Sequence, residues 1–161
     1  MAQLLLFAVL SLFVQGEAFL EMDYDTFDQT DSGWRSLAYE ARYLDAAKLI
    51  DRYSDANREE LLPDEVRLLN FHSGQMYAFA DEYVIAIERF EASCKPHSLD
   101  EANPWNTYVD ATIAFLESDF DALLRQREIL GEGNSLAGSN RAVVDKLVEN
   151  FGKPYSEAYG D

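Results

Sequence analysis

Few side chains in this 161-residue chain could support acid–base, nucleophilic or metal chemistry, and their spacing does not combine them. The candidates are His72, His97, Cys94 and scattered carboxylates. His72 has neither a second histidine four residues away nor a Glu-x-x-His arrangement, so a metal site has little support. A serine nucleophile of the Gly-x-Ser-x-Gly type is absent. We expect no catalytic residue, no metal and no cofactor, and a small hydrolase is the alternative left open.

Two further stretches resemble ligand-binding loops only in composition. Residues 131–139 are rich in glycine and serine, but a phosphate loop ends in Gly-Lys-Ser/Thr and follows a strand, so we interpret this segment as a flexible turn. Carboxylates recur between Glu21 and Asp31, but not in the Asp-x-Asp-x-Asp-Gly order of a calcium loop. We interpret residues 19–31 as an acidic linker or the beginning of the first helix.

The net charge restricts the classes of partner. The chain has 13 basic and 30 acidic side chains, which gives 13 − 30 = −17. Such a surface repels phosphate backbones and anionic lipid, so nucleic acid is not an expected partner. A basic peptide or a cationic protein surface would be attracted, although the same charge also serves solubility. The single cysteine, Cys94, cannot form an intrachain disulfide, and packing is its expected role, with a reactive thiol or an intermolecular bridge as the alternative.

The N-terminus has the composition of a secretory leader. Residues 4–14 are an uninterrupted run of apolar and small residues, too short for a stable membrane anchor. Gly16 and Ala18 place small residues at the −3 and −1 positions, so we predict a signal peptide over 1–18, cleaved after Ala18. No Lys or Arg precedes the run, and a helix docked on the rest of the chain is the alternative. The leader predicts a periplasmic or secreted protein, with no membrane anchor after cleavage.

The remaining chain, 32–161, has the periodicity of helix pairs in a single domain with a C-terminal capping helix. We expect a first pair over 32–42 and 44–54, and a second pair that starts at Pro63 and turns at 80–82. A third pair starts at Asn103-Pro104 and turns at 117–119, and a last helix opens at Asn140. Proline and glycine near its end stop that helix, and the segment 155–159 is expected to cover the end of the stack.

Four residues in the second pair carry a family resemblance. Gly74 and Tyr77 on one helix, and Ala86 and Phe90 on the next, alternate small and aromatic residues so that two antiparallel helices can pack closely. This spacing resembles a tetratricopeptide repeat, and weaker copies lie on either side. The resemblance implies an all-α fold of antiparallel helix pairs stacked as a short right-handed solenoid. Equivalent positions Ala46, Ala86 and Leu123 give intervals of 40 and 37 residues, longer than the usual repeat of about 34.

The resemblance also implies a concave groove lined by the first helix of each pair. The groove residues would be aromatic and mostly uncharged: Arg35, Tyr39, Leu68, Phe71, Gln75, Phe79, Trp105, Tyr108, Thr112 and Phe115. Few Lys, Arg or Asn residues stand at these positions, so binding of a peptide's C-terminal carboxylate is not expected. An apolar or helical segment of an unknown protein suits them better.

Two alternatives remain for this groove. It could stack a small ligand or a carbohydrate on Trp105, Tyr108 and Phe79, or it could be filled by the C-terminal segment in a purely structural component of a cell envelope. The segments 110–117 and 140–159 are also similar to a group of small uncharacterised bacterial exported proteins. That similarity implies a bacterial periplasm, and it implies no activity.

Overall fold

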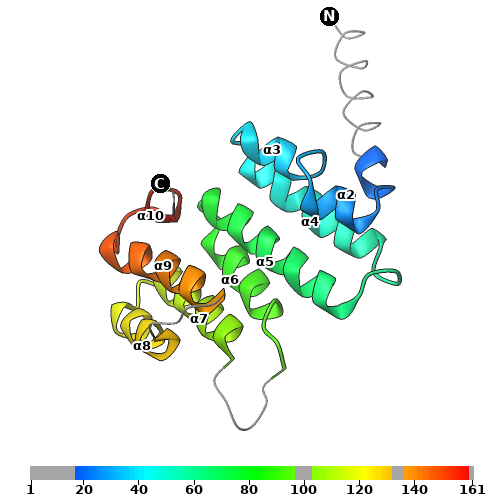
Figure 1. Cartoon of the computed structure of the whole chain (residues 1–161). Helices are drawn as coiled ribbons and strands as arrows, with labels where there is room; N and C mark the ends of the chain where they lie inside the picture. The colour runs from blue at the N-terminus through cyan, green and yellow to red at the C-terminus, as the bar shows by residue number, and fades with distance from the viewer. Residues whose placement is uncertain (1–16, 97–102, 132–135, 160–161) are drawn as a thin grey trace, which may run out of the picture.

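The computed structural model describes residues 17–96, 103–131 and 136–159, without the side chains of 136–139. Within these ranges the chain is all α-helical, which confirms the predicted class, and successive helices cross the molecule side by side (Figure 1). The helices are α2 (Tyr24–Gln29), α3 (Arg35–Tyr39), α4 (Tyr43–Ala56), α5 (Pro63–Phe79), α6 (Tyr83–Ala92), α7 (Pro104–Leu116), α8 (Phe120–Leu130), α9 (Leu136–Glu149) and α10 (Tyr155–Tyr159). The predicted leader lies outside the described residues except for its last two, and His97 lies outside them as well.

One turn geometry recurs at the end of three helices. Ala41, Asp81 and Ser118 follow α3, α5 and α7 and have positive φ angles of 55°, 60° and 60°. After each of them, the next backbone N–H returns to the carbonyl five residues earlier, at distances of 2.9, 2.9 and 2.9 Å. This pattern is a Schellman motif, which satisfies carbonyls left free at a helix end. The three turns are spaced by 81 − 41 = 40 and 118 − 81 = 37 residues, so the helix pairs repeat in structure at the intervals expected from the sequence.

The predicted close crossing at Gly74 is confirmed. A Cβ atom at this position would lie 3.0 Å from Cδ1 of Phe90 and 3.2 Å from the carbonyl oxygen of Ala86. Glycine in a helix interior costs about 1 kcal/mol relative to alanine, and here it allows α5 and α6 to approach closely. Both partners are the residues that the repeat spacing identified.

A polar network joins three helices beside this crossing. Asp51 on α4 accepts hydrogen bonds from Ser73 Oγ (2.6 Å) and Tyr77 Oη (2.9 Å) on α5. It also accepts two parallel bonds from Arg89 Nε and Nη2 on α6, at 3.0 and 2.9 Å. A planar guanidinium matched to a carboxylate in this way fixes orientation as well as charge. The network therefore holds the register of α4, α5 and α6.

The segment 19–31, expected as an acidic linker or the beginning of the first helix, contains helix α2. Asp23 caps it, accepting the backbone N–H of Thr26 at 2.9 Å. Phe27 is fully buried and stacks on Tyr53 with ring centroids 3.7 Å apart. The sequence lacks a helical apolar stripe here because a single turn buries its two inward residues, Phe27 and Asp28, and leaves the rest in solvent.

Two other boundaries differ from the expected ones. The first helix of the first pair is only α3, because Gly33 turns the chain against Phe27, where any Cβ would lie 1.8 Å from the Phe27 carbonyl oxygen. The last helix begins at Leu136 rather than at Asn140, so part of the predicted 131–139 turn is helical. The expected start of the second and third pairs at Pro63 and Pro104 is confirmed.

Candidate functional site

The C-terminal helix α10 lies on the aromatic surface that the sequence predicted as a groove. It packs against α5 and α9, and Figure 1 shows it returning from the end of α9 toward α5. Tyr155 contacts the rings of Phe79 and Phe115 edge-on, at centroid distances of 5.2 and 6.2 Å, and Tyr159 contacts Phe79 at 5.6 Å. We define Gln75, Phe79, Tyr108 and Phe115 as the aromatic face, which α10 covers.

Hydrogen bonds fix the position of α10 on the aromatic face. Gln75 Nε2 donates to Tyr159 Oη at 2.8 Å, and the hydroxyls of Tyr108 and Tyr159 lie 3.5 Å apart. At the start of the helix, the backbone N–H of Tyr155 donates to Tyr83 Oη at 3.1 Å. The Tyr155 hydroxyl is buried and has no hydrogen-bond partner among the described residues. Burial raises the pKa of both Tyr108 and Tyr155 well above the ordinary value, so both phenols stay neutral.

The predicted groove residues are therefore not exposed together. Phe71, Tyr108 and Thr112 are buried in the core, and Gln75 is buried under α10. Thr112 hydrogen-bonds the Tyr108 carbonyl in its own helix at 3.1 Å. The sequence leaves open whether these positions form an open groove, and in the structure the C-terminal segment 155–159 lies on the face of α5, as in the alternative of a groove filled by that segment. The rings of Phe79 and Tyr108 are covered by it as well.

The other predicted groove residues lie elsewhere. Arg35 places its guanidinium 4.3 Å from the ring centroid of Trp34, and the exposed Tyr39 donates to Asp31 Oδ1 at 2.8 Å. Trp105 is half-buried, packs against Phe71 at 4.8 Å and donates its indole N–H to the Ser93 carbonyl at 2.9 Å. Trp105 also lines a recess of about 160 Å³ with Asp64, Arg67, Leu68 and Lys95.

A buried carboxylate that the sequence did not identify lies between α2, α3 and α5. Asp28 has no exposed surface and accepts from Trp34 Nε1 at 2.9 Å, while His72 Nδ1 lies 2.8 Å from its Oδ1. Burial alone would raise the pKa of Asp28, but the hydrogen bonds from His72 and Trp34 and the nearby charge of Arg35 hold it below its ordinary value. Asp28, Trp34 and His72 carry no spacing in the sequence that would reveal this cluster.

Asp28 and His72 form an acid–histidine pair, and among the described residues no serine or cysteine side chain is hydrogen-bonded to His72. The hydroxyl of the neighbouring Ser73 donates its hydrogen bond to Asp51 and not to His72. Among the described residues, no group of three or more His, Cys, Asp or Glu side chains could hold a metal ion. The pair accordingly connects α2 to α5 and fixes the Trp34 ring, with which His72 is in contact at 5.2 Å.

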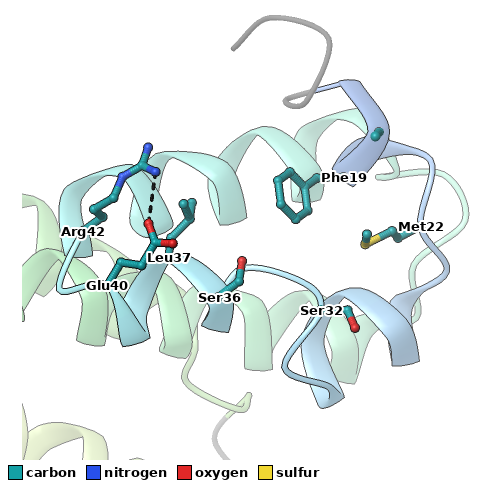
Figure 2. A pocket seen from close by; sticks show the side chains of 8 residues that line it. Phe19, Met22, Ser32, Ser36, Leu37, Glu40 and Arg42 are labelled. Carbon is teal, nitrogen blue, oxygen red and sulfur yellow. Dashed lines mark hydrogen bonds and ion pairs between the residues drawn. The ribbon is translucent and has the colours of Figure 1, made fainter. Parts of the chain in front are cut away.

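A larger pocket of about 390 Å³ lies at the N-terminal end of the described chain (Figure 2). Its apolar lining comes from Phe19, Met22 and Leu37, and Ser32 and Ser36 add hydroxyls. The two charged groups at its edge, Glu40 and Arg42, pair with each other at 3.3 Å, and Arg42 also pairs with Asp45. The charged side chains among the described residues that line this pocket are thus already paired with one another or with Asp45.

Comparisons with known proteins identify no relative: no family model, no curated protein and no solved structure matches the chain. In the part of the chain that the structure describes, no helix is both long and apolar enough to cross a membrane.

Proposed function

We propose that this chain is a polypeptide-binding module whose aromatic face accepts a short helix with two aromatic residues four positions apart. The observation that supports the proposal is the seating of α10, in which Tyr155 and Tyr159 place their rings on Phe79 and Phe115. Residues four apart lie on one side of a helix, so a partner helix with the same spacing could make the same contacts. In the structure, the chain's own C-terminus occupies this position.

The contacts of α10 favour its replacement by a partner. A helix of five residues is not stable by itself, so its order depends on docking. The buried Tyr155 hydroxyl makes no hydrogen bond of normal geometry among the described residues, although the Gln75 amide lies near it, so its burial weakens the docking of α10. A partner helix with phenylalanine at the equivalent position would avoid that cost. The second position would keep a tyrosine, because Gln75 donates to Tyr159 Oη.

An experiment in trans tests this function on the full chain. A Tyr155→Ala, Tyr159→Ala double variant should release α10, and a labelled peptide of sequence Lys-Pro-Tyr-Ser-Glu-Ala-Tyr should then bind it in an NMR titration. Wild type should bind at least about tenfold more weakly, because an attached helix competes at an effective concentration in the millimolar range. The matched control is the same peptide with both tyrosines replaced by alanine.

A further variant separates binding from unfolding. Adding Phe79→Ala to the double variant should abolish peptide binding while the circular dichroism spectrum stays helical. If the folded double variant does not bind the tyrosine peptide, the module hypothesis is wrong, and α10 is a permanent part of the core in a structural component. A partner protein would then have to contact a different surface.

We also propose that the protein is exported and that its leader is removed after Ala18. The apolar run at 4–14 supports this proposal. It is also supported by the first tertiary hydrogen bonds of the described chain, in which Asn57 Nδ2 donates to the Leu20 carbonyl and Tyr53 Oη donates to the Met22 carbonyl. Because Leu20 and Met22 follow the cleavage position, these hydrogen bonds would remain after the leader is removed. A mass spectrum of the exported protein that begins at Met1 would contradict the cleavage.

The finer description of the fold is likewise a proposal. We propose that the three helix pairs stack as a short right-handed solenoid of the tetratricopeptide type. The recurrence of the left-handed turn residue at Ala41, Asp81 and Ser118 supports it, as does the close crossing at Gly74. An experimental structure in which successive helix pairs are not related by the same right-handed rotation would overturn this description.

A further inference from the structure

Both apolar and charged side chains line the recess beside Trp105. Leu68 on α5 and Trp105 on α7 give it apolar surface, and among the described residues Arg67 and Lys95 contribute two cations against the carboxylate of Asp64. This is a local excess of positive charge on a chain whose net charge is −17. None of the residues of the aromatic face lines this recess, so the recess is a separate candidate binding site.

The frame of this recess is fixed by hydrogen bonds. The indole N–H of Trp105 donates to the Ser93 carbonyl at 2.9 Å, which sets the plane of the ring. The adjacent Asn106, itself buried, accepts from the Lys95 N–H at 2.8 Å and donates to the Lys95 carbonyl at 2.9 Å. Two consecutive residues of α7 therefore hold both the stacking surface and the backbone that carries a cation. A site held in this way loses little conformational entropy when it binds a ligand.

Arg67 has binding capacity that the described residues do not use. One of its terminal nitrogens pairs with the carboxylate of Asp64, a side chain that is 78% exposed. Its Nε is buried and has no acceptor among the described residues. A guanidinium offers five N–H donors and favours planar oxyanions. The Arg67 side chain as a whole is 24% exposed, so a carboxylate in the recess could accept from guanidinium donors that Asp64 leaves unused.

We propose that the recess binds a small aromatic carboxylate, with the ring between Leu68 and Trp105 and the carboxylate at Arg67. The volume of about 160 Å³ suits one six-membered ring, since an apolar cavity of about 150 Å³ holds benzene. A flat ring stacks on the indole face, and the guanidinium pairs with the carboxylate.

Benzoate is the probe that tests the site on the full chain. In an NMR titration, benzoate should shift the Trp105 indole N–H resonance to saturation, while the indole resonance of the buried Trp34 serves as an internal control. Benzamide, which has the same shape without the charge, should bind at least about fivefold more weakly. Arg67→Met should weaken benzoate binding by about five- to tenfold, because the ion pair is lost and the apolar wall is kept.

Two variants keep the test interpretable. Lys95→Met should weaken benzoate binding by a smaller factor, and it leaves Arg67 in place if the Arg67 variant fails to fold. Arg125→Met, which removes an exposed cation on α8, should leave the affinity unchanged. Equal binding of benzoate and benzamide, equal binding by the Arg67 and Arg125 variants, or no saturable Trp105 shift would each overturn the proposal. A Trp105 shift by a glutamate-rich peptide but not by benzoate would also overturn it, in favour of a polypeptide ligand.

Discussion

At the scale of single residues, Asp28 joins more elements than any polar group that the sequence singled out. Its carboxylate hydrogen-bonds the Trp34 indole and lies within hydrogen-bonding distance of His72 on α5. Within α2 it also accepts from Tyr24 Oη at 3.2 Å. Because it has no exposed surface, loss of these bonds would leave a buried charge without compensation. Asp28 therefore connects the N-terminal helix, which the sequence did not predict, to the central helix α5.

The first prediction concerns acid stability. The folded pKa of Asp28 lies below its ordinary value of 3.8, so its stabilising contribution is full above the unfolded pKa and is lost as pH falls through the folded pKa. Asp28→Asn should lower the free energy of unfolding by about 2–3 kcal/mol at pH 7. The difference from wild type should shrink below about pH 4. Urea unfolding at pH 7, 4 and 2.5 measures it.

The control for that experiment lies on the same helix. Asp25 is exposed, so Asp25→Asn should change the free energy of unfolding by less than about 0.5 kcal/mol at each pH. A constant Asp28→Asn deficit from pH 7 to pH 2.5 would show that the carboxylate charge is not what stabilises the cluster. The same result would assign the effect to packing of the side chain alone.

At the scale of elements, the left-handed residue Ala41 allows a direct test of the turn geometry at the end of α3. Ala41 has a φ of 55°, a conformation that costs a residue with a Cβ about 1–2 kcal/mol. Ala41→Gly removes this cost but adds backbone entropy to the unfolded chain, so the net gain should be about 0.5–1 kcal/mol. The melting temperature should rise by roughly 1–4 °C, as measured by calorimetry.

Ala38, one turn earlier in α3, provides the matched control. The same change there, Ala38→Gly, should lower stability by about 0.5–1 kcal/mol because glycine is unfavourable inside a helix. Equal destabilisation by both variants would contradict the Schellman geometry at Ala41. The control also shows whether α3, which has only five residues, contributes measurably to stability.

The elements that could be predicted from the sequence are those whose boundaries are set locally. Pro63 and Asn103-Pro104 begin helices because a proline in the first turn loses no hydrogen bond and an asparagine caps it, as Asn103 does for Trp105 at 3.0 Å. Helix α2 could not be found in this way. Its burial depends on Tyr53 and His72, far along the chain, so no local periodicity marks it.

At the scale of the whole molecule, the position of α10 shows what pattern reasoning on the candidate site could not reach. The aromatic residues predicted on α5 and α7 do lie near one another, since the rings of Phe71 and Tyr108 are 5.6 Å apart, but both side chains are buried. Whether that surface is open depends on where a segment 84 residues away from Gln75 docks. Helical spacing carries no such information. The Asp28 cluster and the recess beside Trp105 are also formed by tertiary contacts, so helical spacing could not reveal them either.

The net charge of −17 acts on the molecule as a whole and makes a last prediction. Self-repulsion among 30 carboxylates destabilises the compact state, and added salt screens it, with a Debye length that falls from about 30 Å at 0.01 M to about 8 Å at 0.15 M. Favourable pairs are screened as well, but Arg89 and Asp51 are partly buried and make direct hydrogen bonds, so they should weaken less. The free energy of unfolding should therefore rise by about 1 kcal/mol from 10 to 200 mM NaCl, measured by urea titration at pH 7.

A decrease over this range would show that the ion pairs outweigh the repulsion. Arg89→Met provides the check: without the paired cation, the increase in stability with salt should be steeper than in wild type.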